Sequence, residues 1–104
     1  MKAIIKGKRY NTDKAQLVAK YDNILGGSDF NYLCEKLYQT EKGNWFLAGE
    51  GGPMTKYARH VGNGNKSGGS KITPMTENDV IEWLEEHDHT EILEAYFPEH
   101  IDDA

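Results

Sequence analysis

The side chains best suited to chemistry lie in and just after a glycine-rich turn. Glu50 stands within the turn 49–53, where glycines on both sides let a backbone approach a ligand while the carboxylate points into the gap. Tyr57 and His60 follow closely and add a hydroxyl and an imidazole, which can exchange protons. These residues could form a small ligand-binding or enzymatic site. The alternative is a tight turn whose glycines serve only its geometry, and we favour it because position in a loop alone is weak evidence for a site.

A second group of reactive side chains is a concentration of carboxylates at the C-terminal end. Residues 77–104 hold 11 of the 17 acidic residues and no Lys or Arg, whereas residues 1–76 carry 12 basic and 6 acidic residues. Such an acidic segment repels nucleic acid and membrane surfaces and attracts cationic protein surfaces. The carboxylates that we expect to contact a partner are Glu82, Glu85, Glu86, Glu94 and, in the turn, Glu50.

The basic part of the chain, residues 1–76, suggests nucleic-acid binding, because six Lys and Arg residues lie within residues 1–20 and tyrosines are available for stacking. The net charge of −5 weakens any long-range attraction to phosphate, so direct nucleic-acid binding is not expected. Two other interpretations remain open. The acidic helices could neutralise the basic N-terminal hairpin, or the carboxylates could form a solvated helix face.

No complete catalytic or metal motif is present. The glycine loop 62–70 contains Lys66, but a P-loop needs Gly directly before its Lys and a helix behind it. His87 and His89 are two residues apart, whereas histidines that face one way on a helix are four apart, so we expect solvated side chains. Cys34, the only cysteine, fits a small buried hydrophobe. We therefore expect no cofactor and no bound metal.

Local patterns predict the elements of the N-terminal half. Strand formers and a turn predict a hairpin over 1–11, and N-cap candidates before apolar residues predict a short helix over 13–21. A period of two predicts a strand over 30–39, which a loop containing Gly43 joins to a strand over 45–48. The segment 54–60 has room for one or two helical turns.

The C-terminal half is predicted to be mainly helical. After a mobile surface loop over 62–70 and a short strand over 71–75, a capping box at Thr76 opens a helix. Thr90 opens a last short helix that ends before Pro98. Strands early and helices late predict an α+β fold, with a small, mainly antiparallel sheet of two hairpins and two to four short helices packed on one face.

The chain length of 104 residues predicts one domain over 1–98, with a frayed acidic tail over 99–104. Residues 1–9 contain basic side chains but an apolar run of only three residues, far shorter than the core of a signal peptide. No stretch reaches transmembrane length, so no membrane partner is expected. A lone cysteine is typical of a cytoplasmic protein, and we expect a monomer or homodimer there.

The stretch from Lys42 to Met54, KGNWFLAGEGGPM, with Lys56 and Tyr57 after it, resembles a signature of small proteins from bacterial phages and mobile elements. Residues 6–12 and 72–86 are similar to the same family, so the resemblance spans most of the chain. The family has no established activity, and the resemblance therefore assigns no catalytic residue. It implies a genomic setting in which small accessory proteins are common, among them inhibitors of host defence such as anti-CRISPR proteins.

These observations together predict a non-enzymatic accessory protein that acts by macromolecular binding through an acidic surface. Its expected partner is a host protein, such as a nucleic-acid-handling complex with a cationic groove, and its expected role is counter-defence. The alternative hypothesis is the small ligand-binding or enzymatic domain with its site at the turn 49–53.

Overall fold

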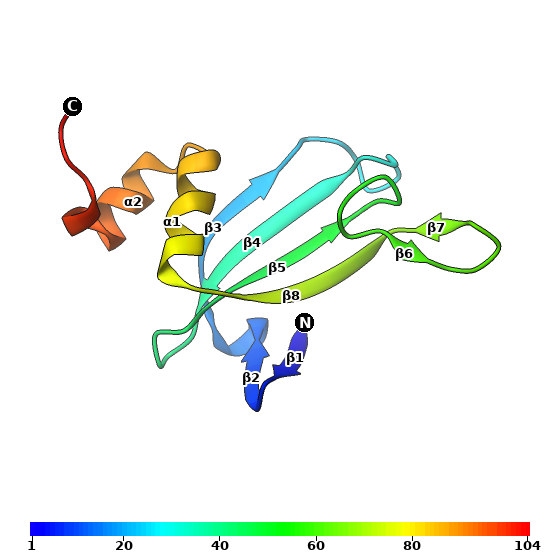
Figure 1. Ribbon diagram of the computed structural model, residues 1–104, viewed down its shortest axis with the longest axis horizontal. Coiled ribbons are helices and arrows are strands. Elements are labelled where there is room, and N and C mark those ends of the chain that lie inside the picture. Colours follow the sequence, from blue (N-terminus) through cyan, green and yellow to red (C-terminus); the bar gives the residue numbers. More distant parts are fainter.

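The computed structural model describes all 104 residues and has the α+β fold that the sequence predicts. Four antiparallel strands form the central sheet in the order β3, β4, β5 and β8 (Figure 1). Their bounds are Gln16–Asp22 for β3, Leu33–Gln39 for β4, Trp45–Gly51 for β5 and Gly69–Met75 for β8. Two helices, α1 (Glu77–Glu86) and α2 (Thr90–Tyr96), follow the last strand.

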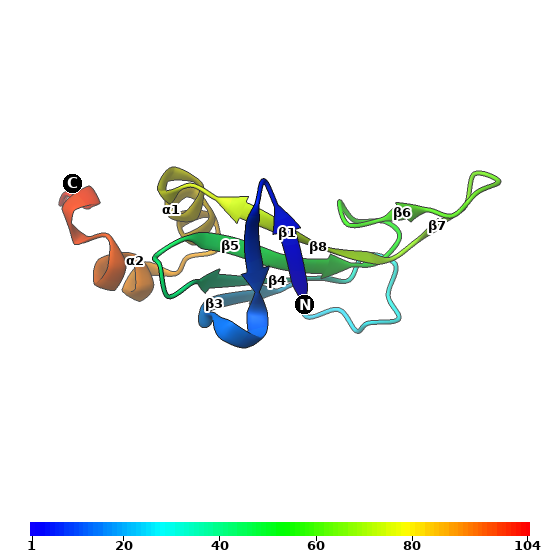
Figure 2. The same ribbon diagram turned by 90° about the horizontal axis from the view of Figure 1, so that it is seen from below.

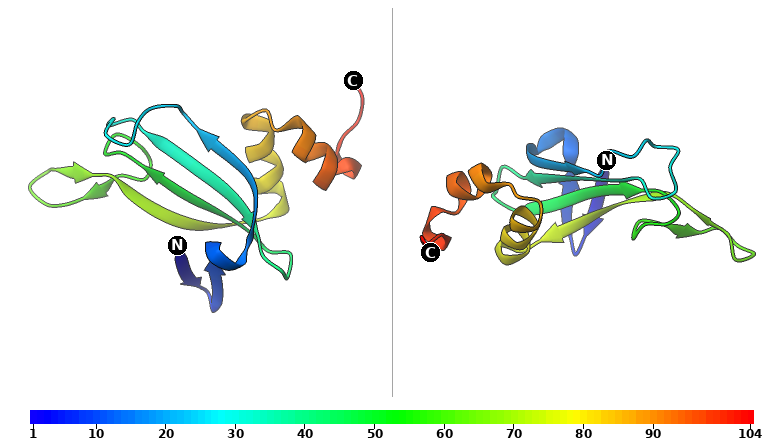
Figure 3. Two further views of the ribbon diagram at one scale, coloured as in Figure 1. Left: turned by 180° about the vertical axis from the view of Figure 1, so that it is seen from behind. Right: turned by 90° about the horizontal axis from the view of Figure 1, so that it is seen from above.

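Two separate hairpins accompany the sheet. One pairs β1 (Lys2–Ile5) with β2 (Lys8–Asn11), and the other pairs β6 (Arg59–His60) with β7 (Lys66–Ser67). Two 3₁₀ turns, η1 (Thr12–Lys14) and η2 (Pro98–His100), complete the structure. The molecule measures 50 × 35 × 19 Å, and the helices and the β6–β7 hairpin lie at opposite ends of its long axis (Figures 1 and 3).

The two faces of the sheet carry separate cores because successive residues of a strand point to opposite sides. On one face, Leu37 and Leu47 pack beneath the helices, which contribute Val80, Trp83 and Leu84. The opposite face carries Phe46, Ala48 and Ile72, and the side chain of Tyr10 from the N-terminal hairpin covers them. Figure 2 shows this hairpin standing across the sheet. The fold therefore places the acidic helices and the basic hairpin on opposite faces.

The predicted β4–β5 hairpin and the predicted start of α1 are confirmed. Gly43 has a positive φ of 86° in the connecting loop, where glycine avoids the strain that a side chain would cause. At the start of α1, the Asp79 backbone N–H donates to Thr76 Oγ1 at 3.1 Å, and the Thr76 N–H donates to Asp79 Oδ2 at 3.0 Å. This capping box satisfies two groups that the helix itself leaves unpaired. Neither helix is long and apolar enough to cross a membrane.

The helix predicted over 13–21 is wrong. A 3₁₀ turn there leads into β3, whose residues pair with β4 from Gln16 opposite Gln39 to Asp22 opposite Cys34. A register shift interrupts the strand between Leu17 and Ala19, and after it Ala19 and Tyr21 share the helix-facing side of the sheet. Pairing with a strand distant in sequence therefore overrides the local helix signals.

Further boundaries differ from the predictions. The strand predicted over 30–39 begins only at Leu33, as β4. The strand expected to end at residue 48 continues as β5 to Gly51. The segment 54–60 contains turns and then β6 rather than a helix, because contacts described below hold it against the sheet. The segment 62–70, expected to be a loop, contains the turn of the β6–β7 hairpin, strand β7 and the start of β8, with positive φ angles at Gly62, Asn63 and Gly64.

Candidate functional site

A buried carboxylate, Glu35, lies where β4, α1 and the loop 53–58 meet. The residue is only 1% exposed, although charged side chains are almost never fully buried unless they are paired. Strand alternation explains its position, since Glu35 shares the helix-facing side of β4 with Leu33 and Leu37. The sequence thus places a charge inside an apolar interface, where it needs partners.

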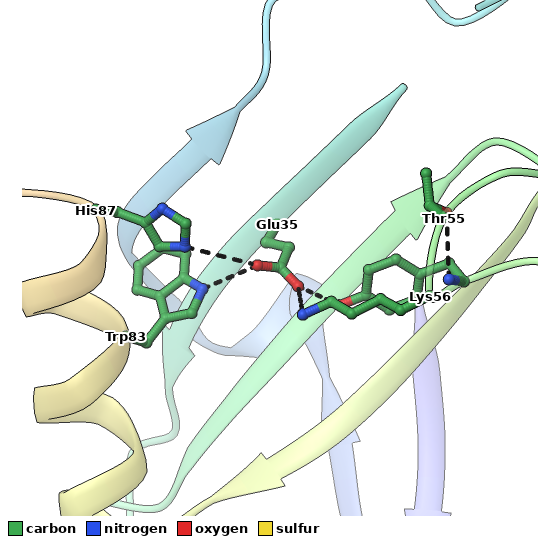
Figure 4. Close-up of polar contacts among 6 residues, drawn as sticks. Glu35, Thr55, Lys56, Trp83 and His87 are labelled. Atoms are coloured by element: carbon green, nitrogen blue, oxygen red, sulfur yellow. Dashed lines mark hydrogen bonds and ion pairs between the residues drawn. The ribbon is translucent and has the colours of Figure 1, made fainter. Parts of the chain in front are cut away.

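Three donors surround the Glu35 carboxylate (Figure 4). The Trp83 indole N–H donates to Oε1 at 3.0 Å, and the Tyr57 hydroxyl donates to Oε2 at 2.6 Å. The Lys56 ammonium lies 2.8 Å from the same Oε2. His87 Nε2 lies 3.9 Å from Oε1, so it adds an ion pair only when the imidazole is protonated. We call these five residues the Glu35 network.

The partners decide which protonation state each group holds. Burial alone would raise the pKa of the Glu35 carboxyl, but the hydrogen bonds from Lys56, Tyr57 and Trp83 outweigh it and hold this pKa below its usual value. Burial, together with the hydrogen bond to Glu35, raises the pKa of the Tyr57 hydroxyl. At neutral pH the pair is therefore a carboxylate and a neutral phenol.

The surroundings of Glu35 suit a structural role better than a role as a catalytic acid or base. A catalytic base works best with a pKa near the operating pH, and the pKa of Glu35 is displaced away from that range. Its two oxygens already accept hydrogen bonds from the loop 53–58 and from α1. The Glu35 network thus connects α1 to the sheet and to this loop.

The glycines of β5 make room for that loop. A Cβ at Gly49 would collide with the Tyr57 hydroxyl, and a Cβ at Gly51 would collide with Thr55 Oγ1. Thr55 in turn accepts from the Tyr57 backbone N–H at 3.2 Å (Figure 4). The space that these glycines leave is therefore filled by the protein itself.

Two open hollows lie on either side of the Lys56 and Trp83 side chains. One, of about 520 Å³, lies between α1 and β8 and is lined by Lys71 and by Asp79, Glu82 and Glu86. The other, of about 400 Å³, is lined by Tyr21, Asn31, Glu86 and His87. Glu86 of α1 lines both hollows.

The structure does not bring Glu50, Tyr57 and His60 together. Glu50 is exposed on the face opposite the helices, where its Oε1 accepts a hydrogen bond from the Tyr32 hydroxyl at 2.7 Å. This bond raises the pKa of the Tyr32 hydroxyl, and partial burial adds to the effect. Tyr57 lies on the helix-facing side beside Gly49, and His60 is exposed in β6.

The four helical carboxylates predicted to bind a partner lie at one end of the molecule. Glu82, Glu85 and Glu86 are exposed on α1, and Glu94 is exposed on α2. We call these four residues the acidic helical surface. Glu50, the fifth predicted contact, lies on the other face of the sheet and is separate from this surface.

The two histidines near the end of α1 are partly buried and not solvated, contrary to expectation. The His87 ring stacks on Tyr21 with 3.9 Å between centroids, and the His89 ring stacks on Trp83 at 5.5 Å. No group of three or more His, Cys, Asp or Glu side chains is placed to hold a metal ion. Cys34 is a free, buried cysteine, as predicted.

Sequence reasoning missed Glu35 and its partners Lys56 and Trp83. One signal was available, since Glu35 lies in the same alternation phase as Leu33 and Leu37, where a solvated charge is not expected. The identity of its donors depends on tertiary contacts. A comparison of the chain with protein-family models, with curated proteins and with solved structures gave no match.

Proposed function

We propose that this protein is a non-enzymatic binding protein whose acidic helical surface docks on a cationic surface of a partner protein. The observation that carries the proposal is that the carboxylates of residues 77–104 form no ion pairs within the protein. Both ion pairs of the structure involve Glu35, and no carboxylate of residues 77–104 lies within 4.0 Å of a Lys or Arg side chain. The negative electrostatic field of residues 77–104 can therefore attract a cationic partner.

Neutralisation by the N-terminal hairpin is not supported. The hairpin packs on the face of the sheet opposite the helices, through contacts such as Tyr10 against Phe46. The basic hairpin and the acidic helices thus face different directions. Lys56 and Lys71 line a hollow together with Glu82 and Glu86, but neither forms an ion pair with a carboxylate of α1. A partner can therefore supply the complementary charge.

The acidic helical surface is also held firmly. Val80, Trp83 and Leu84 of α1 are buried against the sheet, and the Trp83 indole donates to Glu35. Side chains on a fixed helix lose less conformational entropy on binding than those on a mobile segment, which favours affinity. Electrostatic complementarity would speed association and make the complex sensitive to salt.

The partner that fits this chemistry is a protein with a cationic groove, and the resemblance to mobile-element proteins suggests a nucleic-acid-handling host protein in the cytoplasm. A row of carboxylates in such a groove would compete with phosphate groups. On this proposal the protein is a counter-defence inhibitor of the anti-CRISPR type, acting by occupying its target.

Affinity capture from host lysate tests the proposal, with captured proteins and nucleic acids both identified. We expect a protein partner at low salt that is lost at high salt. The variant carrying Glu82→Lys, Glu85→Lys and Glu86→Lys should lose it. The matched control carries Glu99→Lys, Asp102→Lys and Asp103→Lys, an equal change of charge in the C-terminal tail, and should retain it. Equal capture by both variants would remove the acidic helical surface from the proposal.

The alternative site at the turn 49–53 has less support. Tyr57 and Thr55 occupy the space beside Gly49 and Gly51, so the glycines leave no gap for a ligand there. Glu50 and Tyr57 also point to opposite faces of the sheet, which separates the groups that a shared site would need.

A further inference from the structure

A basic hollow of about 610 Å³ lies between the N-terminal hairpin, η1 and the loop 40–44. It is lined by the cationic side chains Lys8, Arg9, Lys14 and Lys42 and by a single carboxylate, Glu41. These residues come from three segments of the chain, and the fold brings them together. The volume lies within the range of small-molecule sites, which run from about 300 to 1,000 Å³.

The charge of this hollow is not neutralised within the protein. None of the four cationic side chains forms an ion pair, because both ion pairs of the structure belong to Glu35. Although Glu41 also lines the hollow, positive charge predominates there, and a cleft with a predominance of one sign of charge raises the local concentration of counter-ions. The overall net charge of −5 does not reveal this local positive charge, because it adds the basic residues 1–76 to the acidic residues 77–104.

The neutral residues of the hollow narrow the class of ligand. Its one hydrophobic lining residue, Tyr10, is 7% exposed and packs edge-on against Phe46, so it offers no open face for stacking a base. Asn11 and Asn44 bring side-chain amides, which can donate to anionic oxygens. The hollow thus provides cations and amide donors, without an aromatic platform.

We propose that the basic hollow binds adjacent phosphate groups through Lys8, Arg9, Lys14 and Lys42. The phosphates can come from a free polyphosphate or from the backbone of a nucleic-acid strand, since both present closely spaced anionic oxygens. With no platform for stacking, binding to a strand is independent of base sequence. The site lies apart from the acidic helical surface and does not depend on its function.

Two probes distinguish the sources. Calorimetry with tripolyphosphate measures binding of a free polyphosphate, and fluorescence anisotropy with labelled oligothymidine measures binding of a strand. The test variant carries Lys14→Gln and Lys42→Gln, both at exposed positions. The matched control carries Arg59→Gln and Lys66→Gln, an equal loss of charge in the exposed β6–β7 hairpin.

We expect the test variant to bind at least about tenfold more weakly than the wild type, and the control to stay within about twofold. For a strand, loss of two phosphate contacts should also reduce the slope of log affinity against log salt by about 1.4. Binding of tripolyphosphate alone assigns the hollow to free polyphosphates, and binding of the strand assigns it to a backbone. Failure of both probes to bind the wild type, or an equal loss in the two variants, would overturn the proposal.

Discussion

Replacing Glu35 by Gln removes the charge at the centre of the Glu35 network while keeping the side-chain shape. The wild-type carboxylate accepts from Trp83, Tyr57 and Lys56. A glutamine has one acceptor oxygen and one NH₂ group. In the variant, the NH₂ group takes the place of one carboxylate oxygen and faces a hydrogen-bond donor. The variant therefore loses a charge-assisted hydrogen bond and leaves a buried donor unpaired.

The structure sets the size of this effect. A hydrogen bond to a charged group contributes about 1.5–3 kcal/mol, and an unpaired buried donor costs about 1–3 kcal/mol. The Lys56 side chain is 63% exposed, so solvent screening limits its ion pair with Glu35 to about 1 kcal/mol or less. Since these contributions overlap, we expect Glu35→Gln to lower the free energy of unfolding by about 2–4 kcal/mol. A domain with a stability of about 5–15 kcal/mol would remain folded.

Urea denaturation followed by tryptophan fluorescence measures the change, because Trp45 and Trp83 are both buried. The matched control is Glu50→Gln, whose carboxylate also accepts a tyrosine hydroxyl, from Tyr32 at 2.7 Å, but at an exposed site. The control should lose about 1 kcal/mol or less. If Glu35→Gln costs no more than this control, the Glu35 network does not stabilise the fold and our explanation of the buried carboxylate is wrong.

Three further predictions concern the same region. The pKa of Glu35 is lowered in the folded protein, so the ionised carboxylate stabilises the fold above the ordinary Glu pKa of 4.5, and this stabilisation is lost as the pH falls further. Urea titrations at acid pH should therefore show a smaller decrease in the free energy of unfolding for Glu35→Gln than for the wild type. The pKa of Tyr57 is raised, so its neutral hydroxyl stabilises the fold below the ordinary Tyr pKa of 10.0, and this stabilisation declines above it. The free energy of unfolding of Tyr57→Phe, measured in urea at alkaline pH, should lack this decline. Gly49→Ala should cost about 1–3 kcal/mol, because the new Cβ displaces Tyr57, whereas Gly26→Ala, which meets open space, should cost much less in the same assay.

Much of the fold could be predicted from sequence because its signals are local. The turn glycine Gly43 lies between two strand patterns, and Thr76 begins a capping box directly before the apolar stripe of α1. In both places neighbouring residues settle the conformation. The fold class follows from the order of these elements along the chain.

The conformation of residues 13–21 could not be predicted from local signals. Its N-cap candidates and apolar residues suit a short helix, yet Ala19 and Tyr21 also have the spacing of residues that share one face of a strand. Pairing with β4 decides between the two, and a single segment does not carry that information.

The buried site was beyond sequence reasoning for the same physical cause. Tyr57 is 22 residues from Glu35 and Trp83 is 48 residues from it. Residues so far apart in sequence form no local spacing pattern from which their contact could be predicted. The role of Gly49 is likewise visible only once Tyr57 lies against it, so the sequence left a ligand site open as the less favoured alternative to a tight turn.

The most direct test of the proposed function is carboxylate footprinting of the protein in complex with its captured partner. Exposed carboxylates are labelled with a carbodiimide and an amine, and mass spectrometry compares the free and bound protein. We predict protection of Glu82, Glu85, Glu86 and Glu94 on binding, with unchanged labelling of Asp102 and Asp103. Full labelling of the acidic helical surface in the intact complex, with protection elsewhere, would contradict the account.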